Sequence, residues 1–520
     1  MSSEGQPSFS SQVPELNDTV PDIEDAFEKL NSALFKNLTD VAVSTAKKLG
    51  AGYSDIRMCR YNQENIYTRE ERVENIRNQR DIGFGVRVLV DGTWGFASSN
   101  SLSTAEVERV TLQAIEIAKA NLVLQKRRVE LEHLTAYTAK WRMRMEKDPF
   151  QISTDDKIEK LLSINKRAME LGVSFCSSHL FFVREEKYFG SSIGSFIYQT
   201  RVRTEPGFTV TMIEKSSGRF ETRQSFTPPR AAGYEYIENV DLLGEVEQAS
   251  EDVKIKLRAK PVEAGVKDLV IHPTNLWLTI HETIGHPTEL DRALGMEANY
   301  AGTSFLTTDK LGKLQYGSPI VNIVADRTQQ GGLATVGYDD DGIKTAGAEF
   351  FIIHNGMFDA YQMAIGQAKL IGQEKSNGCA YADSWDKMPV QRMPNISLQP
   401  AQEDTTIDEL IADVKDGIYI LGDGSWSIDQ QRYNFQFGGQ VFYEIKNGKL
   451  GNMLRNVAYQ GNTIDFWNAC DGLCGKSEYF LGGTFNCGKA QPPQGAPVSH
   501  GAVPARFRNI NVLSTERSDL

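Results

Sequence analysis

The sequence contains few cysteines, no long apolar run and no excess of basic residues. Six cysteines among 520 residues are too few for a disulfide scaffold, and reduced thiols are typical of the cytoplasm. No run approaches the roughly 18 to 20 apolar residues that span a bilayer, and residues 1–17 lack the apolar segment of a secretory signal. Lys and Arg number 56 against 68 Asp and Glu, which argues against binding nucleic acid through its phosphates. We therefore expect a cytoplasmic protein whose partners include neither a membrane nor nucleic acid.

The length and composition indicate a folded chain of more than one domain. The charged fraction of 24% and the hydrophobic fraction of 40% are those of a globular protein. A chain of 520 residues exceeds what one hydrophobic core usually organises. Residues 1–20 read as a flexible polar lead. We expect a domain boundary near residue 250, in an acidic, helix-prone segment, which gives an N-terminal domain over 21–250 and a C-terminal domain over 251–520.

The spacing of apolar residues predicts an α+β fold. Residues 21–50 have the helical period and end at a glycine, whereas residues 55–61 and 65–69 alternate as short strands. Asp91-Gly92 predicts a hairpin turn, and residues 175–226 predict an antiparallel sheet. Most of the 44 glycines lie in the second half of the chain, between short apolar runs. The C-terminal domain should therefore be rich in β-strands.

The most informative segment is the motif His281-Glu282-Thr283-Ile284-Gly285-His286, which contains two of only seven histidines. Metalloproteases pair two histidines on one face of a helix with a glutamate that takes a proton from metal-bound water. Here the spacing between the histidines is one residue longer than in that pattern.

The longer spacing needs an irregular backbone. On a regular helix, residues five apart diverge by about 140°, whereas residues four apart diverge by about 40°. The helix must therefore contain a π-bulge, or it must end before His286 and let the chain bend back. Gly285 supplies permissive backbone, and Pro287 disfavours helical geometry at His286.

The spacing alone leaves a zinc site and a surface hydrogen-bond network as alternatives. A third ligand would favour zinc, but local spacing does not choose among the candidates. These are Glu289, Asp291, His354, Cys470, Cys474, Cys487 and His500.

Several segments resemble the TldD/PmbA metallopeptidases. They are residues 281–291, residues 300–305, and Cys487-Gly488-Lys489 leading to Pro497-Val498-Ser499. The resemblance extends over nearly the whole chain, from the region of residues 55–100 onward. In that family the catalytic subunit carries the longer histidine motif and the partner subunit lacks it. This chain therefore resembles the TldD-type catalytic subunit.

The resemblance implies a ligand set in the C-terminal domain. His281, His286 and Cys487 would hold one Zn²⁺ per chain, and Glu282 would be the general base. Cys474 begins a second Cys-Gly-Lys tripeptide, but only Cys487 is followed by the Gln-Pro and Pro-Val-Ser pattern of the family. Two neutral imidazoles and a thiolate would leave a fourth position on the zinc for water or a substrate carbonyl.

Four further residues have alternative readings. Glu289 and Asp291 match acidic positions of the family motif and either hydrogen-bond a ligand histidine or lie in a solvated turn. His500 and Arg506 either face a developing oxyanion or are structural.

The predicted activity is zinc-dependent hydrolysis of unfolded polypeptides or short peptides by metal-activated water. The resemblance implies a homodimer, or a heterodimer with a homologous PmbA/TldE-like subunit, that encloses the active site. One alternative is a non-catalytic binding or modulator subunit of a TldD/PmbA-type complex. Another is a cysteine peptidase that uses Cys487 with His500.

Overall fold

The computed structural model describes residue 27 and residues 32–516. The predicted polar lead, residues 1–20, lies outside the described residues. Of the helix predicted over 21–50, the structure describes α2 (Ser32–Lys48), whose buried side chains include Phe35, Leu38 and Ala42 at helical spacing. The first helix therefore forms because one apolar face can pack on the sheet beneath it.

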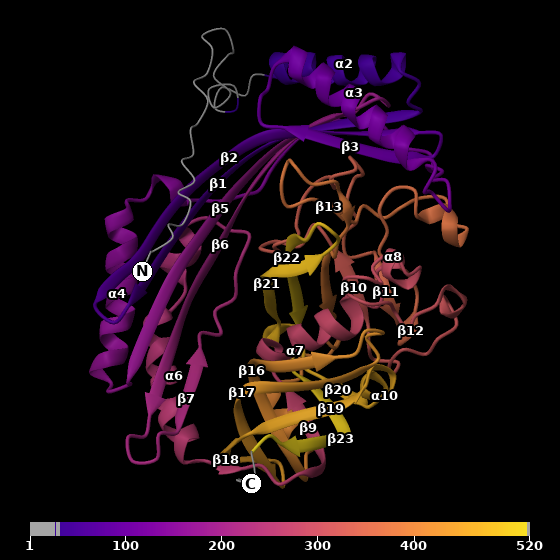
Figure 1. The fold of residues 1–520 in the computed structure, drawn as a ribbon. Helices are drawn as coiled ribbons and strands as arrows, with labels where there is room; N and C mark the ends of the chain where they lie inside the picture. The colour runs from indigo at the N-terminus through magenta and orange to yellow at the C-terminus, as the bar shows by residue number, and fades with distance from the viewer. Residues whose placement is uncertain (1–26, 28–31, 517–520) are drawn as a thin grey trace, which may run out of the picture.

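The N-terminal half is organised by a long sheet, antiparallel except for the β4–β6 pair, that arches over the rest of the molecule (Figure 1). Its strand order is β3-β2-β1-β5-β6-β4, and β7 pairs with β6. The central strands are β1 (Tyr53–Arg69), β2 (Arg72–Val90), β5 (Phe175–Ser191) and β6 (Phe196–Ile213). The turn predicted at Asp91-Gly92 is confirmed: both residues have positive φ, 49° and 77°, and they join β2 to β3 (Thr93–Ser99).

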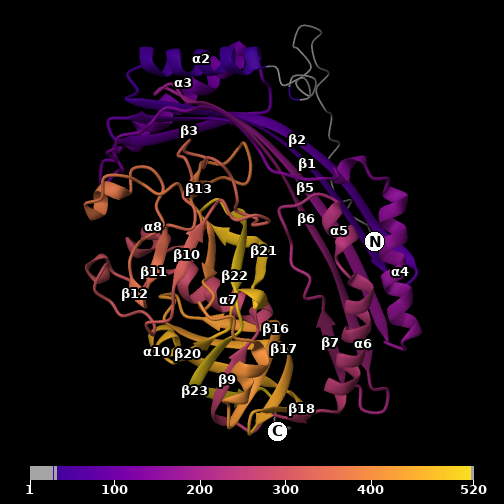
Figure 2. The ribbon, with the colours of Figure 1, turned by 180° about the vertical axis from the view of Figure 1, so that it is seen from behind.

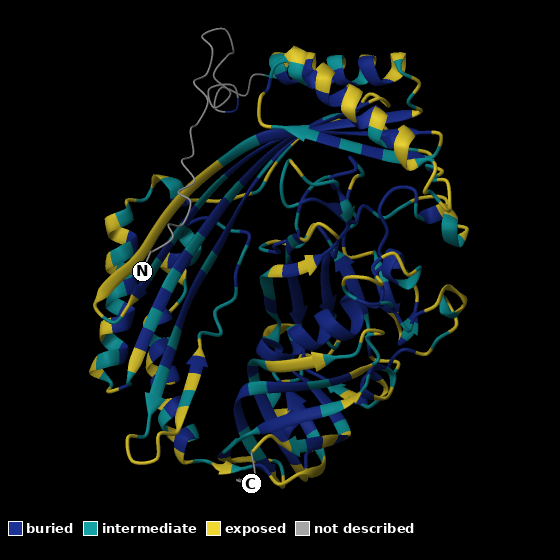
Figure 3. Cartoon of the chain, viewed as in Figure 1, coloured by how far each residue is buried: buried dark blue, intermediate teal, exposed yellow. Residues whose placement is uncertain are grey.

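Helices pack at both ends of this arch (Figure 2). At one end, α2 and α3 (Thr104–Asn121) share a buried core with Phe84, Val86 and Val88 of β2. At the other end, α4 (Thr154–Glu170) and α6 (Leu242–Arg258) bury Ile164 and Val246 against β6. The segment of β2 from Arg72 to Arg80, which pairs with β1 but not with β3, is exposed (Figure 3). The other N-terminal elements are β4 (Thr138–Arg142), β7 (Phe220–Gln224) and α5 (Glu235–Asn239).

The C-terminal half is rich in β-strands, as predicted, and is built on a mixed sheet with the order β16-β9-β23-β19-β17-β18-β8. Because β16 also pairs with β17, the strands β16, β9, β23, β19 and β17 form a closed ring. Two two-stranded sheets, β13-β14 and β21-β22, and the four-stranded sheet β12-β11-β10-β15 lie in the same half. One large core is shared by the mixed sheet, the four-stranded sheet and β21-β22, and it includes Leu269, Ile280, Ile396 and Val498.

The bounds of the C-terminal elements are as follows. The strands are β8 (Lys260–Pro261), β9 (Gly265–Ile271), β10 (Ile323–Asp326), β11 (Phe351–His354), β12 (Met357–Phe358), β13 (Ala380–Tyr381), β14 (Val390–Gln391), β15 (Asn395–Leu398), β16 (Asp416–Ile428), β17 (Asn434–Lys446), β18 (Lys449–Arg455), β19 (Val457–Asn462), β20 (Cys470–Leu473), β21 (Phe480–Lys489), β22 (Gln494–Ala502) and β23 (Ala505–Ser514). The helices are α7 (Pro273–Ile280), α8 (Leu290–Ala293), α9 (Ile407–Ala412) and α10 (Thr463–Asn468).

The predicted boundary at 250/251 falls inside α6, which runs to Arg258. The division of the chain into domains over 21–250 and 251–520 stays a prediction. Among the described residues, no helix is both long and apolar enough to cross a bilayer.

Candidate metal centre

The histidine motif lies on a helix that changes its winding in the middle. His272 caps the start of α7, where its side chain accepts a hydrogen bond from the Thr274 amide, and Pro273 occupies the first turn. After Ile280 the chain forms a π-helical turn, His281–Gly285, closed by a 3.1 Å bond from the His286 amide to the His281 carbonyl. The first of the two predicted backbone solutions, a π-bulge, is therefore the correct one.

The π-turn brings both imidazoles to one face of the helix. The ring centroids of His281 and His286 are 4.7 Å apart. His286 keeps helical backbone, φ −65° and ψ −44°, so the effect expected from Pro287 is overridden. The His286 ring is buried and bonded to Glu289, and this packing holds the conformation.

Gly285 is required for space. Its φ is not in the left-handed region, but a Cβ at this position would lie 2.6 Å from Met393 Sδ. The turn therefore needs a glycine at this position because there is no room for a side chain, and not because the backbone conformation requires one.

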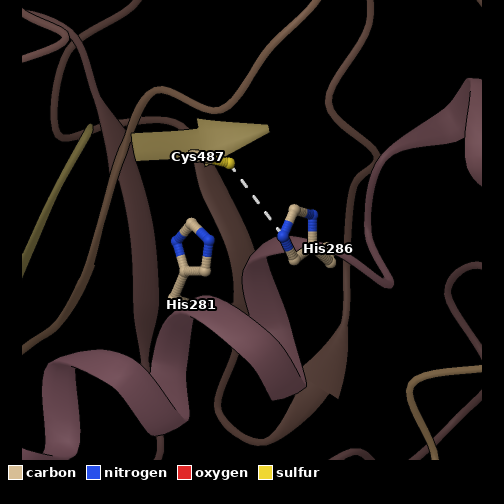
Figure 4. Close-up of side chains that lie close together, drawn as sticks. All are labelled: His281, His286 and Cys487. Carbon is tan, nitrogen blue, oxygen red and sulfur yellow. Dashed lines mark hydrogen bonds between the residues drawn. The ribbon is translucent and has the colours of Figure 1, made fainter. Parts of the chain in front are cut away.

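Cys487 approaches the two histidines from a different element. It lies on β21, opposite Ala496 of β22, next to an irregularity in the strand register after Thr484. The ligand atoms of His281, His286 and Cys487 all lie within 4.8 Å of one another, and all three side chains are buried. Cys487 Sγ is 4.0 Å from His286 Nε2, and the two rings and the sulfur face a common space (Figure 4).

Among the described residues, this is the only group of three His, Cys, Asp or Glu side chains close enough to hold a metal ion. Cys474 is buried elsewhere, where its amide donates to the Pro504 carbonyl. The residues at the centre fit zinc because two imidazole nitrogens and one thiolate are typical donors for this ion. Burial lowers the pKa of both His281 and His286, which keeps the imidazoles neutral.

Glu289 anchors His286. Its Oε2 accepts a 3.0 Å bond from His286 Nδ1 and a 2.9 Å bond from Arg292 Nε. Burial raises the pKa of Glu289, but Lys489 and Arg292 outweigh it and hold this pKa well below its usual range. Asp291 contacts neither His281 nor His286; it accepts a 2.8 Å bond from Lys489 Nζ. Both acids are buried, so the solvated-turn alternative is wrong.

Lys489 ties the cysteine strand to the histidine segment. It follows Cys487 by two residues, is fully buried, and also lies 3.2 Å from Glu289 Oε1. Lys476, which follows Cys474 in the same way, is exposed. The two Cys-Gly-Lys tripeptides therefore differ in the environment of the lysine as well as that of the cysteine.

Glu282 lines a cleft between the arch and the C-terminal body. This cleft has a volume of about 480 Å³, and its walls include Gln224 of the arch and Trp277, His281 and Thr484 of the body. Arg432 Nη1 donates a 2.5 Å bond to Glu282 Oε2. Arg432 lies 150 residues from its partner, in a turn after β16 with φ 63°, and no motif in the sequence pointed to it.

Neither of the two oxyanion candidates, His500 and Arg506, is among the residues that line the cleft. Arg506 forms a 2.8 Å ion pair with Asp471, and His500 lies behind His281, with its Nε2 2.7 Å from His281 Nδ1. His500 Nδ1 is 2.9 Å from the Ile396 carbonyl. Both ring nitrogens of His500 are thus engaged, which contradicts a Cys487–His500 pair of the cysteine-peptidase type.

The sequence matches family models and relatives over most of its length. Models of the PmbA/TldA metallopeptidase domain 1, central domain and C-terminal domain match residues 54–118, 147–257 and 265–513. A metalloprotease of Methanocaldococcus jannaschii is 27% identical over 449 residues, which cover 86% of this chain and 94% of the relative. A protein of Saccharolobus solfataricus named zinc metalloprotease TldD homolog is 23% identical and covers 82% of this chain and 90% of its own length.

A solved structure has the same fold. TldE from Thermococcus kodakarensis superposes with a TM-score of 0.70 at 16% identity, covering 92% of this chain and 99% of its own. Because the three domain models together match most of the described chain, the protein belongs to the PmbA/TldD metallopeptidase family.

Proposed function

We propose that this chain is a zinc-dependent peptidase in which His281, His286 and Cys487 hold the metal and Glu282 is the general base. The observation that carries the proposal is the convergence of three buried ligand atoms beside a cleft that Glu282 also lines. A zinc ion in this position would supply a Lewis acid that polarises a peptide carbonyl and lowers the pKa of water.

The protein's own groups then move the proton. Arg432 holds Glu282 through Oε2, which leaves Oε1 as the atom that accepts a proton from the attacking water. The same carboxyl can pass that proton to the leaving amine. Burial of Glu282, at 3% exposure, limits competition from bulk water.

The shape of the cleft supports an extended peptide as substrate. A second cleft of about 310 Å³ adjoins the first and shares Gln224, Trp277, Asp423 and Thr484 with it. β21, which carries Cys487, pairs only with β22 among the described strands, so its other edge can bind a peptide by strand addition. A folded protein could not enter such a space, so we propose unfolded polypeptides or short peptides as substrates.

We also propose assembly with a second subunit. The named relatives include a TldD homolog, and TldE shares the fold, which supports either a homodimer or a heterodimer with a TldE-like partner. The partner would complete the enclosure of the cleft.

The test is the substitution Glu282→Gln in the full-length protein. The amide oxygen can still accept from Arg432, so the fold and the zinc content should persist, while cleavage of an unfolded substrate falls by about 10²-fold or more. Zinc is measured by elemental analysis and cleavage by mass spectrometry. Glu132→Gln serves as a control, because Glu132 is also buried but binds the Gly366 amide away from the cleft.

Retained cleavage in Glu282→Gln would contradict the assignment of this residue as the base. A wild-type protein that carries zinc but cleaves no unfolded substrate, alone or with a homologous partner, would favour the modulator alternative.

A further inference from the structure

His500 lies directly behind one of the proposed metal ligands. It is fully buried on β22, and its Nε2 is 2.7 Å from His281 Nδ1. On its other side, His500 Nδ1 is 2.9 Å from the backbone carbonyl of Ile396 on β15. His281, His500 and Ile396 thus form a chain of two hydrogen bonds from the ligand ring to the backbone.

The chemistry of the groups decides which atom donates and which accepts in these two hydrogen bonds. A carbonyl oxygen only accepts, so His500 Nδ1 carries a proton and donates it to Ile396. If His500 Nε2 were also protonated, the ring would be a buried imidazolium, and no carboxylate contacts it among the residues that the structure describes. His500 Nε2 is therefore an acceptor, and His281 Nδ1 is the donor of the 2.7 Å bond.

This arrangement leaves His281 with its lone pair on Nε2. His286 reaches the same state by another route, because its Nδ1 donates to Glu289 Oε2 and its Nε2 faces Cys487 Sγ at 4.0 Å. Glu289 remains a carboxylate beside Lys489 and Arg292, so it also only accepts. Both histidines therefore have an unprotonated Nε2 that is free to bind a metal ion. For His286 the partner that fixes this state is the Glu289 carboxylate, and for His281 it is the neutral ring of His500.

We propose that His500 is a positioning residue that fixes the tautomer and orientation of His281, so that its Nε2 is ready to bind the metal ion. The inference rests on the proposed zinc site. It assigns to His500 no contact with substrate and no part in moving the substrate's protons. Outer hydrogen bonds of this kind typically contribute 10- to 100-fold to metal affinity.

The test compares two substitutions of His500 in the full-length, metal-stripped protein. His500→Phe keeps a ring but removes both hydrogen bonds, and zinc affinity, measured by competition with a chelator, should fall by about 10- to 100-fold. His500→Gln can still accept from His281 and donate to Ile396, so it should recover most of that affinity. His179→Phe, at a partly buried histidine outside the metal centre, is the control and should bind zinc like the wild type.

A second readout needs no zinc. With ¹⁵N-labelled histidine, nuclear magnetic resonance of the zinc-free protein resolves the tautomer of each of the seven rings. The His281 signals, assigned by their loss in His281→Gln, should show the proton on Nδ1 in the wild type and in His500→Gln.

Two results would overturn the proposal: a proton on His281 Nε2 in the zinc-free wild type, or wild-type zinc affinity in His500→Phe. If His500→Phe does not fold, the tautomer measurement and His500→Gln still decide. A wild-type protein that takes up no zinc but has the expected tautomer would refute the proposed function and leave the hydrogen-bond chain intact.

Discussion

At the scale of single residues, two cysteines in the same local sequence have different surroundings. Cys487 and Cys474 both begin a Cys-Gly-Lys tripeptide and both are buried, but only Cys487 lies near the two histidines. Cys487→Ser should therefore lose most of the bound zinc, because a serine hydroxyl is a poor zinc ligand. Cys474→Ser is the matched control and should retain about one zinc per chain. Elemental analysis of the purified variants checks both expectations. Loss of zinc in Cys474→Ser but not in Cys487→Ser would mean that Cys474, and not Cys487, holds the metal.

A second residue, Glu205, should make stability depend on pH. Burial raises the pKa of Glu205 from 4.5 to about 7, and no ion pair to it occurs among the described residues. Between about pH 4.5 and pH 7 the folded state then binds more protons than the unfolded state, so stability falls as pH rises through this window. Glu205→Gln should remove this decline and raise the free energy of unfolding at pH 8 by about 3 kcal/mol.

Urea unfolding at pH 4.5 and pH 8 measures the effect of Glu205→Gln. Glu74→Gln, on the exposed part of β2, should leave the pH dependence unchanged. If the free energy of unfolding changes with pH equally in Glu205→Gln and in the wild type, the pKa of Glu205 is not raised in the folded protein.

Local spacing in the sequence pointed only to those candidate site residues that are close together in the chain. His281, Glu282 and His286 follow from one motif, and Cys487 was found through the family resemblance. The contacts of Arg432 and Lys489 were missed because a turn and a strand far from the histidine motif in the chain carry them to Glu282 and Glu289. The role of His500 was also missed, since its contacts to His281 and Ile396 depend on how β22 packs between α7 and β15.

At the scale of elements, the π-turn depends on tight packing at Gly285. A Cβ there would lie 2.6 Å from Met393 Sδ and 3.1 Å from Met393 Cε, and Met393 is itself buried. Gly285→Ala should destabilise the protein by about 1 to 3 kcal/mol and weaken zinc binding, because the turn must shift. Thermal unfolding and chelator competition measure the two effects.

Gly461→Ala provides the control for this substitution, since a Cβ at Gly461 would meet only Phe435 at 3.7 Å. In a Met393→Ala background, Gly285→Ala should cost less, because the obstructing side chain is gone. An equal cost in both backgrounds would mean that the turn does not need this space.

Among the elements, turns and alternating strands were predicted well, and strand lengths were not. The hairpin at Asp91-Gly92 and the antiparallel pairing of β5 with β6 are confirmed. Residues 55–61 and 65–69 were predicted as separate strands but form the single strand β1. The polar residues between these two segments do not look like part of a buried strand. Glu64 is nevertheless buried there, because it forms an ion pair with Lys157 from α4.

At the scale of the whole molecule, buried ion pairs join the arch to the C-terminal body. Asp340 of the body lies 2.8 Å from Lys187 Nζ of β5 and 3.4 Å from Arg57 Nη1 of β1. A second pair, Arg87 with Asp341 at 2.8 Å, lies beside it. Because the cleft with Glu282 is formed between the arch and the body, these contacts maintain the walls of the proposed active site.

Removing the charge of Asp340 should loosen this junction. Burial raises the pKa of Asp340, but Lys187 and Arg57 outweigh it and keep this pKa below its ordinary value. Asp340→Asn would leave two buried cations short of a counter-charge, and we expect the free energy of unfolding to fall by about 3 kcal/mol at pH 7. Since the carboxylate stabilises the protein only while it is ionised, the difference from the wild type should shrink as pH falls below about 4.

Asp40→Asn, which breaks an exposed pair with Lys36, is the control and should cost less than about 1 kcal/mol. Urea unfolding of the three proteins at pH 7 and at about pH 3, inside the window where the difference should shrink, decides the matter. Equal stabilities at pH 7 would mean that the arch and the body are held together without this cluster.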